Sequence, residues 1–167
     1  RSQTVTGVQT CALPICDVQD FHVNCTNVER SVITKTMLAI AQIEVSVKTF
    51  WADLYRRMPK PEIGAVGMTF AESEVRHMDA YSHLLDLLGL NAEFEQIEQV
   101  PAIIDRIHYL DDYLGPSNGQ SDQDFAFSIL LFSIFIEHVS LFSQFLIMLA
   151  FDKYEKKFKG VANAVEA

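Results

Sequence analysis

Carboxylate side chains occupy the middle of three long apolar segments of this 167-residue chain. Glu44 lies among Leu, Ile, Ala and Val residues, and Glu137 follows a run of Ile and Phe. A third segment carries Glu74 and His77, whose spacing places both side chains on one face of a helix. Burying a lone carboxylate is costly unless it is paired, protonated or bound to a metal. The pattern therefore predicts a metal site.

The order of these residues matches part of a ligand pattern for two metal ions. Ferritin-like dimetal proteins use one Glu from each of two helices and a Glu-x-x-His motif from each of two others. Glu44, Glu74-x-x-His77 and Glu137 follow this order, but no second Glu-x-x-His follows Glu137. Each signal alone has a simpler explanation, since Glu44 could pair with Lys48 one turn away and Glu74 could be a solvated surface residue. We interpret the conjunction as an incomplete site for iron or manganese, which carboxylate and imidazole ligands suit.

The elements that must position these residues are long helices, and the sequence shows no strand pattern. Thr26 and Glu29 form a capping-box pattern before a helix that ends ahead of Pro59. Cap, Gly and Pro signals delimit further helices over 62–88, 101–114 and 122–154. Three of the helices are far longer than the usual ~11–12 residues. Long helices with short links predict an all-α fold, an antiparallel bundle.

The apolar segment 125–151 is long enough to cross a membrane. Its only charged or titratable residues, Glu137 and His138, lie at its centre, where an ionisable group is most costly in lipid. Neither an aromatic belt nor a flanking basic bias supports a span. A helix that is apolar all round is also typical of the centre of a soluble bundle. We therefore expect a buried core helix and no membrane partner.

Composition indicates one globular domain that does not bind nucleic acid. Hydrophobic residues make up 49% of the chain and charged residues 21%, which permits a core and excludes wholesale disorder. The net charge of -9 disfavours binding to a phosphate backbone. Cys11, Cys16 and Cys25 show neither zinc-ligand spacing nor an even count for disulfides. A reducing, cytoplasmic setting is the expectation.

The first sixteen residues differ in character from the rest. The stretch Val5–Ile15 reads as a translated frame of a common short-read sequencing adapter. A disordered N-terminus or a short signal peptide is the alternative, but no apolar run of adequate length follows Arg1. We predict that residues 1–16 are non-native and that residues 17–167 form a partial dimetal helical domain.

The residues from about Asp17 to Ala167 resemble the small, radical-generating subunit of class I ribonucleotide reductase. The resemblance is most specific over 41–51 and 70–81. It implies a ferritin-like bundle that is truncated at both ends, with the second Glu-x-x-His just beyond Ala167. It also implies the following ligands for a dinuclear iron or manganese centre: Glu44, Glu74, His77 and Glu137.

The resemblance further implies how the intact protein acts. The metal pair reacts with oxygen or a reduced oxygen species, and the resulting oxidant or radical passes to a cysteine of the large (alpha) subunit, where the ribonucleotide loses its 2′-hydroxyl. Tyr81 follows His77 by one turn, where many members keep a radical tyrosine. Lys48 follows Glu44 by one turn and is expected near the Tyr81 phenol, as in a subclass whose oxidant resides on manganese. Alternatively, Lys48 pairs with Glu44 or reaches solvent.

Other expectations concern the partners and the rival functions. The resemblance implies a homodimer, and Trp51 does not match the family's relay tryptophan, so we expect Trp51 to pack in the core. Another ferritin-like dimetal oxidase or an iron-storage bundle would share the carboxylates but not the amino-acid sequence of residues 42–51 and 70–81. A metal-free helical interaction module would have to explain three buried carboxylates.

Overall fold

The computed structural model describes residues 15–114 and 121–166, without the side chains of Ile15, Val45, Ser46, Lys48, Glu98, Asp111, Tyr113, Leu114 and Glu166. Helices are the only regular secondary structure in this described part, which confirms the predicted all-α class. Most of the predicted adapter-derived segment 1–16 and the predicted loop 115–119 lie outside it. The α-helices are α1 (Ile15–Gln19), α2 (Asn27–Arg57), α3 (Pro61–Leu88), α4 (Asn91–Glu95), α5 (Pro101–Leu114), α6 (Asp122–Leu131), α7 (Phe142–Ala150) and α8 (Lys159–Glu166).

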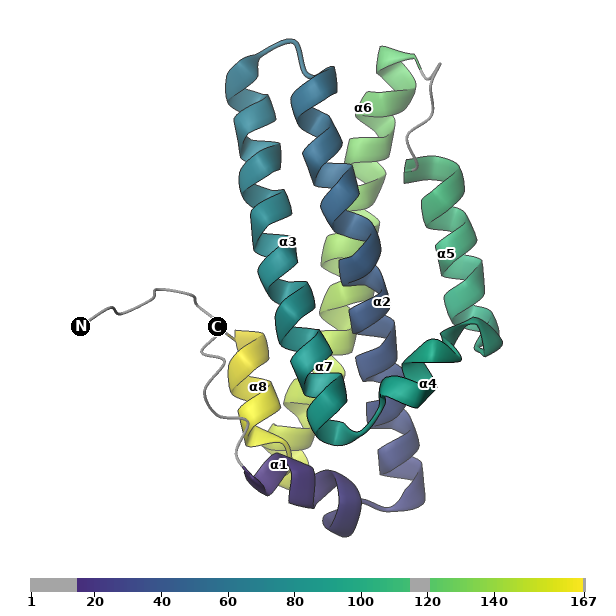
Figure 1. Ribbon diagram of the computed structural model, residues 1–167, viewed down its shortest axis with the longest axis vertical. Helices are drawn as coiled ribbons and strands as arrows, with labels where there is room; N and C mark the ends of the chain where they lie inside the picture. Colours follow the sequence, from purple (N-terminus) through teal and green to yellow (C-terminus); the bar gives the residue numbers. More distant parts are fainter. Residues whose placement is uncertain (1–14, 115–120, 167) are drawn as a thin grey trace, which may run out of the picture.

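Helices α2 and α3 form an antiparallel pair that runs the length of the bundle (Figure 1). The predicted capping box is present at the start of α2, where the Thr26 N–H donates to Glu29 and the Glu29 N–H donates to the Thr26 hydroxyl. The two helices approach closely at Gly67, because a Cβ atom there would lie 2.5 Å from the Trp51 carbonyl oxygen. This contact fixes α3, which carries Glu74 and His77, against the helix that carries Glu44.

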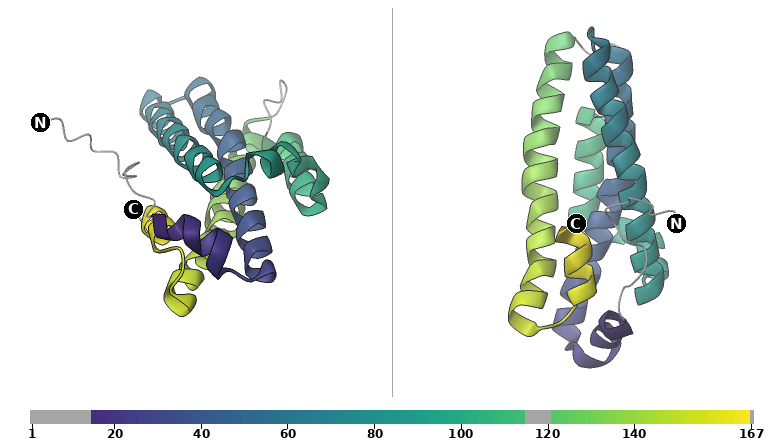
Figure 2. Two further views of the ribbon diagram at one scale, coloured as in Figure 1. Left: turned by 60° about the horizontal axis from the view of Figure 1, so that its bottom comes forward. Right: turned by 90° about the vertical axis from the view of Figure 1, so that its left-hand side faces the viewer.

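The predicted helix 122–154 is one continuous helix over Asp122–Glu155, shown along its length in the right view of Figure 2. Its middle, Phe132–Leu141, and its end, Phe151–Glu155, are π-helical, as is the segment Asp20–Asn24 near the N-terminus. A short 3₁₀ turn, Ile97–Gln99, precedes α5. Sequence patterns predicted none of the π-helical segments, because apolar periodicity does not separate an α-helix from a π-helix in a uniformly apolar stretch.

The expected core helix is buried on one face only in the described structure. Phe132, Ile136 and Met148 are buried in the bundle, whereas Phe135 and Leu146 are more than half exposed. The reason is that the described elements pack against one face of the helix only. By length and composition it is also the one helix within 15–114 and 121–166 that could cross a membrane, and 22% of its apolar window is buried.

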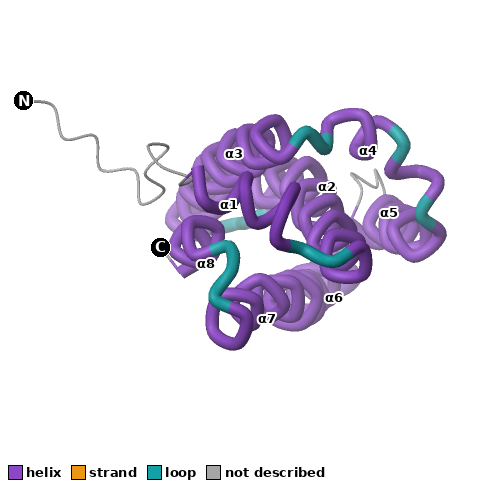
Figure 3. Tube along the Cα trace, turned by 90° about the horizontal axis from the view of Figure 1, so that it is seen from below, coloured by secondary structure: helices purple, strands orange, loops and turns teal. Residues whose placement is uncertain are grey.

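The N-terminal and C-terminal helices of the described chain lie side by side at one end of the bundle (Figure 3). Lys156 and Phe158 adopt left-handed backbone conformations, with φ of 57° and 61°, and turn the chain back after the long helix. Helix α8 then packs against α7 and against α1. Sequence analysis ended the last helix correctly near Tyr154 but predicted neither α1 nor α8, because both are short.

Candidate metal site

Three of the four predicted ligands converge between α2 and α3. Glu44, Glu74 and His77 each offer a ligand atom, and these atoms all lie within 4.8 Å of one another. His77 Nδ1 lies 3.0 Å from Glu74 Oε2 and 3.7 Å from Glu44 Oε2. The i,i+3 spacing on α3 and the close packing of α2 on α3 together produce this cluster.

The Glu44 carboxylate is fully buried, and neither of its oxygens has a hydrogen-bond partner among the described residues. Burial raises the pKa of Glu44 to about 7, against the attraction of the neighbouring His77. Buried polar groups in folded proteins are nearly always hydrogen-bonded, so an unpaired carboxylate requires a specific reason. The His77 imidazole, with Nδ1 3.7 Å from Glu44 Oε2, is one source of positive charge for this carboxylate, and a bound cation would be another.

The pKa values of the residues in this cluster depend on one another. Interaction with Glu44 at 3.7 Å and with Glu74 at 3.0 Å raises the pKa of His77 to about 10, which favours the protonated imidazole. Burial works against ionisation of Glu74, but the interactions with His77 and Glu44 outweigh it and lower the pKa of Glu74.

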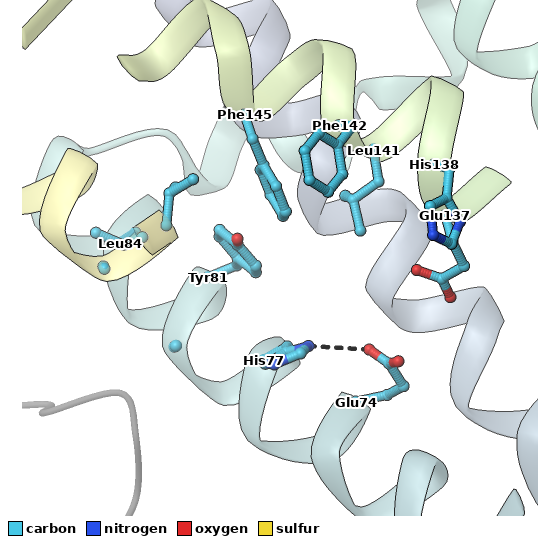
Figure 4. Close-up of a pocket in the computed structure, with 12 residues that line it drawn as sticks. Glu74, His77, Tyr81, Leu84, Glu137, His138, Leu141, Phe142 and Phe145 are labelled. Atoms are coloured by element: carbon cyan, nitrogen blue, oxygen red, sulfur yellow. Dashed lines mark hydrogen bonds and ion pairs between the residues drawn. The ribbon is translucent and has the colours of Figure 1, made fainter. Parts of the chain in front are cut away.

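Glu137 lies outside this three-residue cluster but faces the same space. A cavity of about 360 Å³ separates α3 from the long helix, and its lining includes Glu74, His77 and Glu137. Figure 4 shows Glu137 pointing from the long helix toward Glu74 and His77. Burial, followed by the charge of Glu74, raises the pKa of Glu137. The four predicted ligands therefore surround one region, with Glu137 set back from the other three.

The backbone around Glu137 is a feature that sequence analysis missed. Glu137 lies inside the ten-residue π-helical segment Phe132–Leu141. π-Helical turns are rare and occur frequently at functional sites. Their wider hydrogen-bonding pattern changes which residues share a face, so positions five apart lie above one another. A sequence pattern based on α-helical spacing could not locate this change.

Tyr81 lies one turn after His77 and lines the same cavity. It is buried, and burial followed by the negative charges of Glu44 and Glu74 raises its phenol pKa, so the side chain is a neutral phenol. Figure 4 shows the ring directed into the space next to His77. The Lys48 side chain lies outside the described part of the structure, and the predicted pair between Lys48 and Tyr81 stays a prediction.

The donor set fits divalent iron or manganese. Glu44, Glu74 and Glu137 provide carboxylate oxygens and His77 provides an imidazole nitrogen, a hard to borderline set. Neither Glu44 oxygen has a hydrogen-bond partner among the described residues, and the two carboxylates raise the pKa of His77, so the cluster favours positive charge. Exposed acidic clusters are common without a metal, but Glu44 is fully buried and Glu74 is 8% exposed.

Comparison with known proteins agrees with the geometry. The family "Ribonucleotide reductase, small chain" matches residues 15–167. The "Probable ribonucleoside-diphosphate reductase small subunit" of Invertebrate iridescent virus 3 is 25% identical over 152 residues, which cover 83% of this chain and 40% of that protein. The protein of the same description from Invertebrate iridescent virus 6 is 29% identical over 147 residues, which cover 81% and 41%. The chain thus spans about two fifths of the length of these relatives, and it belongs to the ribonucleotide reductase small chain family.

Proposed function

We propose that this chain is part of the small subunit of a ribonucleoside-diphosphate reductase. We further propose that its carboxylate cluster provides ligands for a dinuclear metal centre. The observation that carries the proposal is the fully buried Glu44 carboxylate, which has no hydrogen-bond partner among the described residues and lies beside Glu74 and His77. Family membership supports it independently. A metal-free interaction module would leave the buried charge of Glu44 unexplained.

The residues of the chain would share the work as follows. Glu44, Glu74 and His77 would bind one ion, while Glu137 would bind the second from across the cavity. When bound, an iron or manganese pair supplies a strong one-electron oxidant after reaction with oxygen or a reduced oxygen species. Tyr81, a buried neutral phenol one turn from His77, would either lose an electron or stay a bystander, depending on where its proton can go.

Manganese is the metal that we propose, with iron as the alternative. The basis is the resemblance of the chain to the subclass that carries a lysine at the position of Lys48. An ammonium group that donates to the Tyr81 oxygen would leave the phenolic proton fewer routes away, which keeps the oxidising equivalent on the metals. We further propose a cytoplasmic homodimer that works with the large subunit, which binds the nucleotide and carries the reacting cysteine.

The test uses the uninterrupted gene that contains this chain, expressed with the large subunit from the same source. The protein is loaded with manganese or with iron, and deoxyribonucleotide formation and metal content are measured. We expect Glu44→Ala to abolish both stoichiometric metal binding and turnover. Glu72→Ala is the matched control, because Glu72 is exposed on α3 and pairs with Arg76 at 2.6 Å.

The outcomes separate the candidate functions. Metal binding without ribonucleotide reduction would overturn the proposal in favour of another dimetal oxidase or an iron store. Absence of metal from the wild-type protein, with folding intact, would favour an interaction module. Equal losses in Glu44→Ala and Glu72→Ala would show that the cluster is not the site.

A further inference from the structure

The single tryptophan of the chain lies next to the candidate metal site, and its polar atom has no partner. Trp51 is 7% exposed, and its indole Nε1 is buried without a hydrogen-bond partner among the described residues. A buried N–H group without an acceptor costs about 1–3 kcal/mol. Packing accounts for the ring, as sequence analysis predicted, but packing does not account for the N–H group.

The neighbours of Trp51 place it at one end of the site. Trp51 follows Glu44 by seven residues, which is close to two turns of α-helix, so both side chains lie on one face of α2. Its ring makes an edge contact with Phe70, at 5.0 Å between centroids, and Phe70 precedes Glu74 by one turn of α3. The ring is therefore positioned by the same two helices that carry the ligand cluster.

Another ring contact joins Trp51 to the long helix. The Trp51 and Phe132 rings meet edge to face, with centroids 5.2 Å apart and planes at 90°. Phe132 precedes Glu137 by five residues within the π-helical segment, where residues five apart are hydrogen-bonded neighbours along the axis. A ring that packs on Phe132 thus lies toward the side of the long helix that carries Glu137.

Glu137 is the acceptor that this geometry offers. Interaction with the Trp51 side chain opposes the rise in the Glu137 pKa, although the indole Nε1 and the carboxylate are not within hydrogen-bond geometry in this structure. Among the aromatic neighbours of the ring, Phe50, Phe70 and Phe132 offer no lone pair. A tryptophan N–H usually finds a partner when it is buried.

We propose that Trp51 is a positioning residue for the metal site, in which the indole Nε1–H donates a hydrogen bond to the Glu137 carboxylate and fixes the orientation that Glu137 presents to the cavity. Partners of this kind orient metal ligands from outside the ligand set. The role of Glu137 as a ligand rests on the proposed function, whereas the proposed hydrogen bond does not require a metal.

Ultraviolet resonance Raman spectroscopy of the 167-residue chain tests the bond, because the indole N–H band reports hydrogen-bond strength and the chain has one Trp. We expect the wild-type band at the position of a hydrogen-bonded indole. Glu137→Gln should shift it partway, and Glu137→Leu should shift it to the position of a free N–H. Glu72→Gln is the control and should leave it unchanged.

A free N–H band in the wild type, or a band position that neither Glu137 substitution changes, would overturn the proposal. Glu137→Gln is nearly isosteric, so it keeps the test usable if Glu137→Leu does not fold. These outcomes do not depend on metal or on turnover, which separates failure of this inference from failure of the proposed function.

The positioning role is tested by manganese affinity in the intact protein. Trp51→Phe keeps an aromatic ring but removes the N–H, and we expect affinity to fall about tenfold or more, as for other partners of metal ligands. Phe50→Leu is the matched packing control, since Phe50 contacts both Trp51 and Phe132. Equal losses of affinity in the two variants would show that Trp51 contributes only through packing, which would contradict the proposal.

Discussion

Asp17 accepts a hydrogen bond from the backbone N–H of Val161 at 2.7 Å, although 144 positions separate the two residues. The other Asp17 oxygen accepts from the Gly160 N–H at 3.2 Å. The first N–H groups of a helix have no partner within the helix, so Asp17 satisfies two such groups of α8. Asp17 is 1% exposed, and this buried contact holds the first described helix against the last.

The contact predicts that Asp17→Ala destabilises the chain by about 1–3 kcal/mol, the usual cost of leaving buried polar groups unsatisfied. Urea unfolding measures the change in free energy, and hydrogen exchange at Val161 measures the local loosening of α8. Asp79→Ala, at an exposed position on α3, should stay within about 0.5 kcal/mol of wild type. Equal exchange rates at Val161 in the two variants would contradict the prediction.

A second cross-link predicts an acid-dependent stability. Glu29 accepts from Lys157 at 2.6 Å and from the Thr26 N–H, and these bonds lower the pKa of Glu29 to about 2. The folded-state value lies below the ordinary 4.5, so the stabilisation is complete above pH 4.5 and is lost as pH falls toward 2.

Thermal unfolding between pH 6 and about pH 2 tests this dependence. Glu29→Gln should flatten the fall in melting temperature below pH 4.5, because the variant has no carboxylate to protonate. Glu93→Gln is the control, since Glu93 is exposed on α4. Parallel curves for wild type and Glu29→Gln would show that this ion pair does not cause the loss of stability in acid.

Metal binding at the cluster should release protons. In the metal-free chain the pKa of Glu44 is raised to about 7 and that of His77 to about 10, whereas metal ligands must be deprotonated. We therefore expect manganese affinity to rise as pH increases above 7. Calorimetry in buffers of different ionisation enthalpy measures the released protons, and a heat that is independent of buffer would contradict the prediction.

Tyr81 tests where the oxidising equivalent resides in the intact protein. If manganese and the lysine at position 48 keep it on the metals, Tyr81→Phe should retain nucleotide reduction. Electron paramagnetic resonance of wild type and variant, each loaded with manganese and separately with iron, gives the second readout. A narrow tyrosyl signal that disappears together with activity in Tyr81→Phe would show that the oxidising equivalent resides on Tyr81 and not on the metals. The family assignment would not be affected.

The exposed side of the long helix predicts self-association of this chain. Large apolar residues are exposed along it: Phe127, Leu130, Ile134, Phe135, Val139, Phe142 and Leu146. Extended apolar patches of this kind drive association. Sedimentation velocity should show concentration-dependent oligomers that the double variant Phe135→Gln/Leu146→Gln reduces, whereas Val28→Gln, exposed at the start of α2, should not. A monomer at all concentrations would contradict the prediction.

Local signals in the sequence were sufficient to predict the long helices and to name the candidate ligands. The capping residues Thr26 and Glu29, the prolines that begin α3 and α5, and the apolar lengths of the segments act within a few residues, so helix bounds follow from them. Glu44, Glu74 and His77 could be named because a carboxylate in an apolar helix has few stable explanations.

Only the tertiary structure decided how these residues meet. The close approach of α2 to α3 at Gly67 brings Glu44 to His77, while Glu137 faces the cavity from the π-helical part of the long helix. The contact of Asp17 with α8 and the placement of the Trp51 ring against Phe132 are likewise long-range. Helical periodicity states which residues share a face, but which faces meet depends on packing between segments far apart in the chain, and that information resides in no single stretch of sequence.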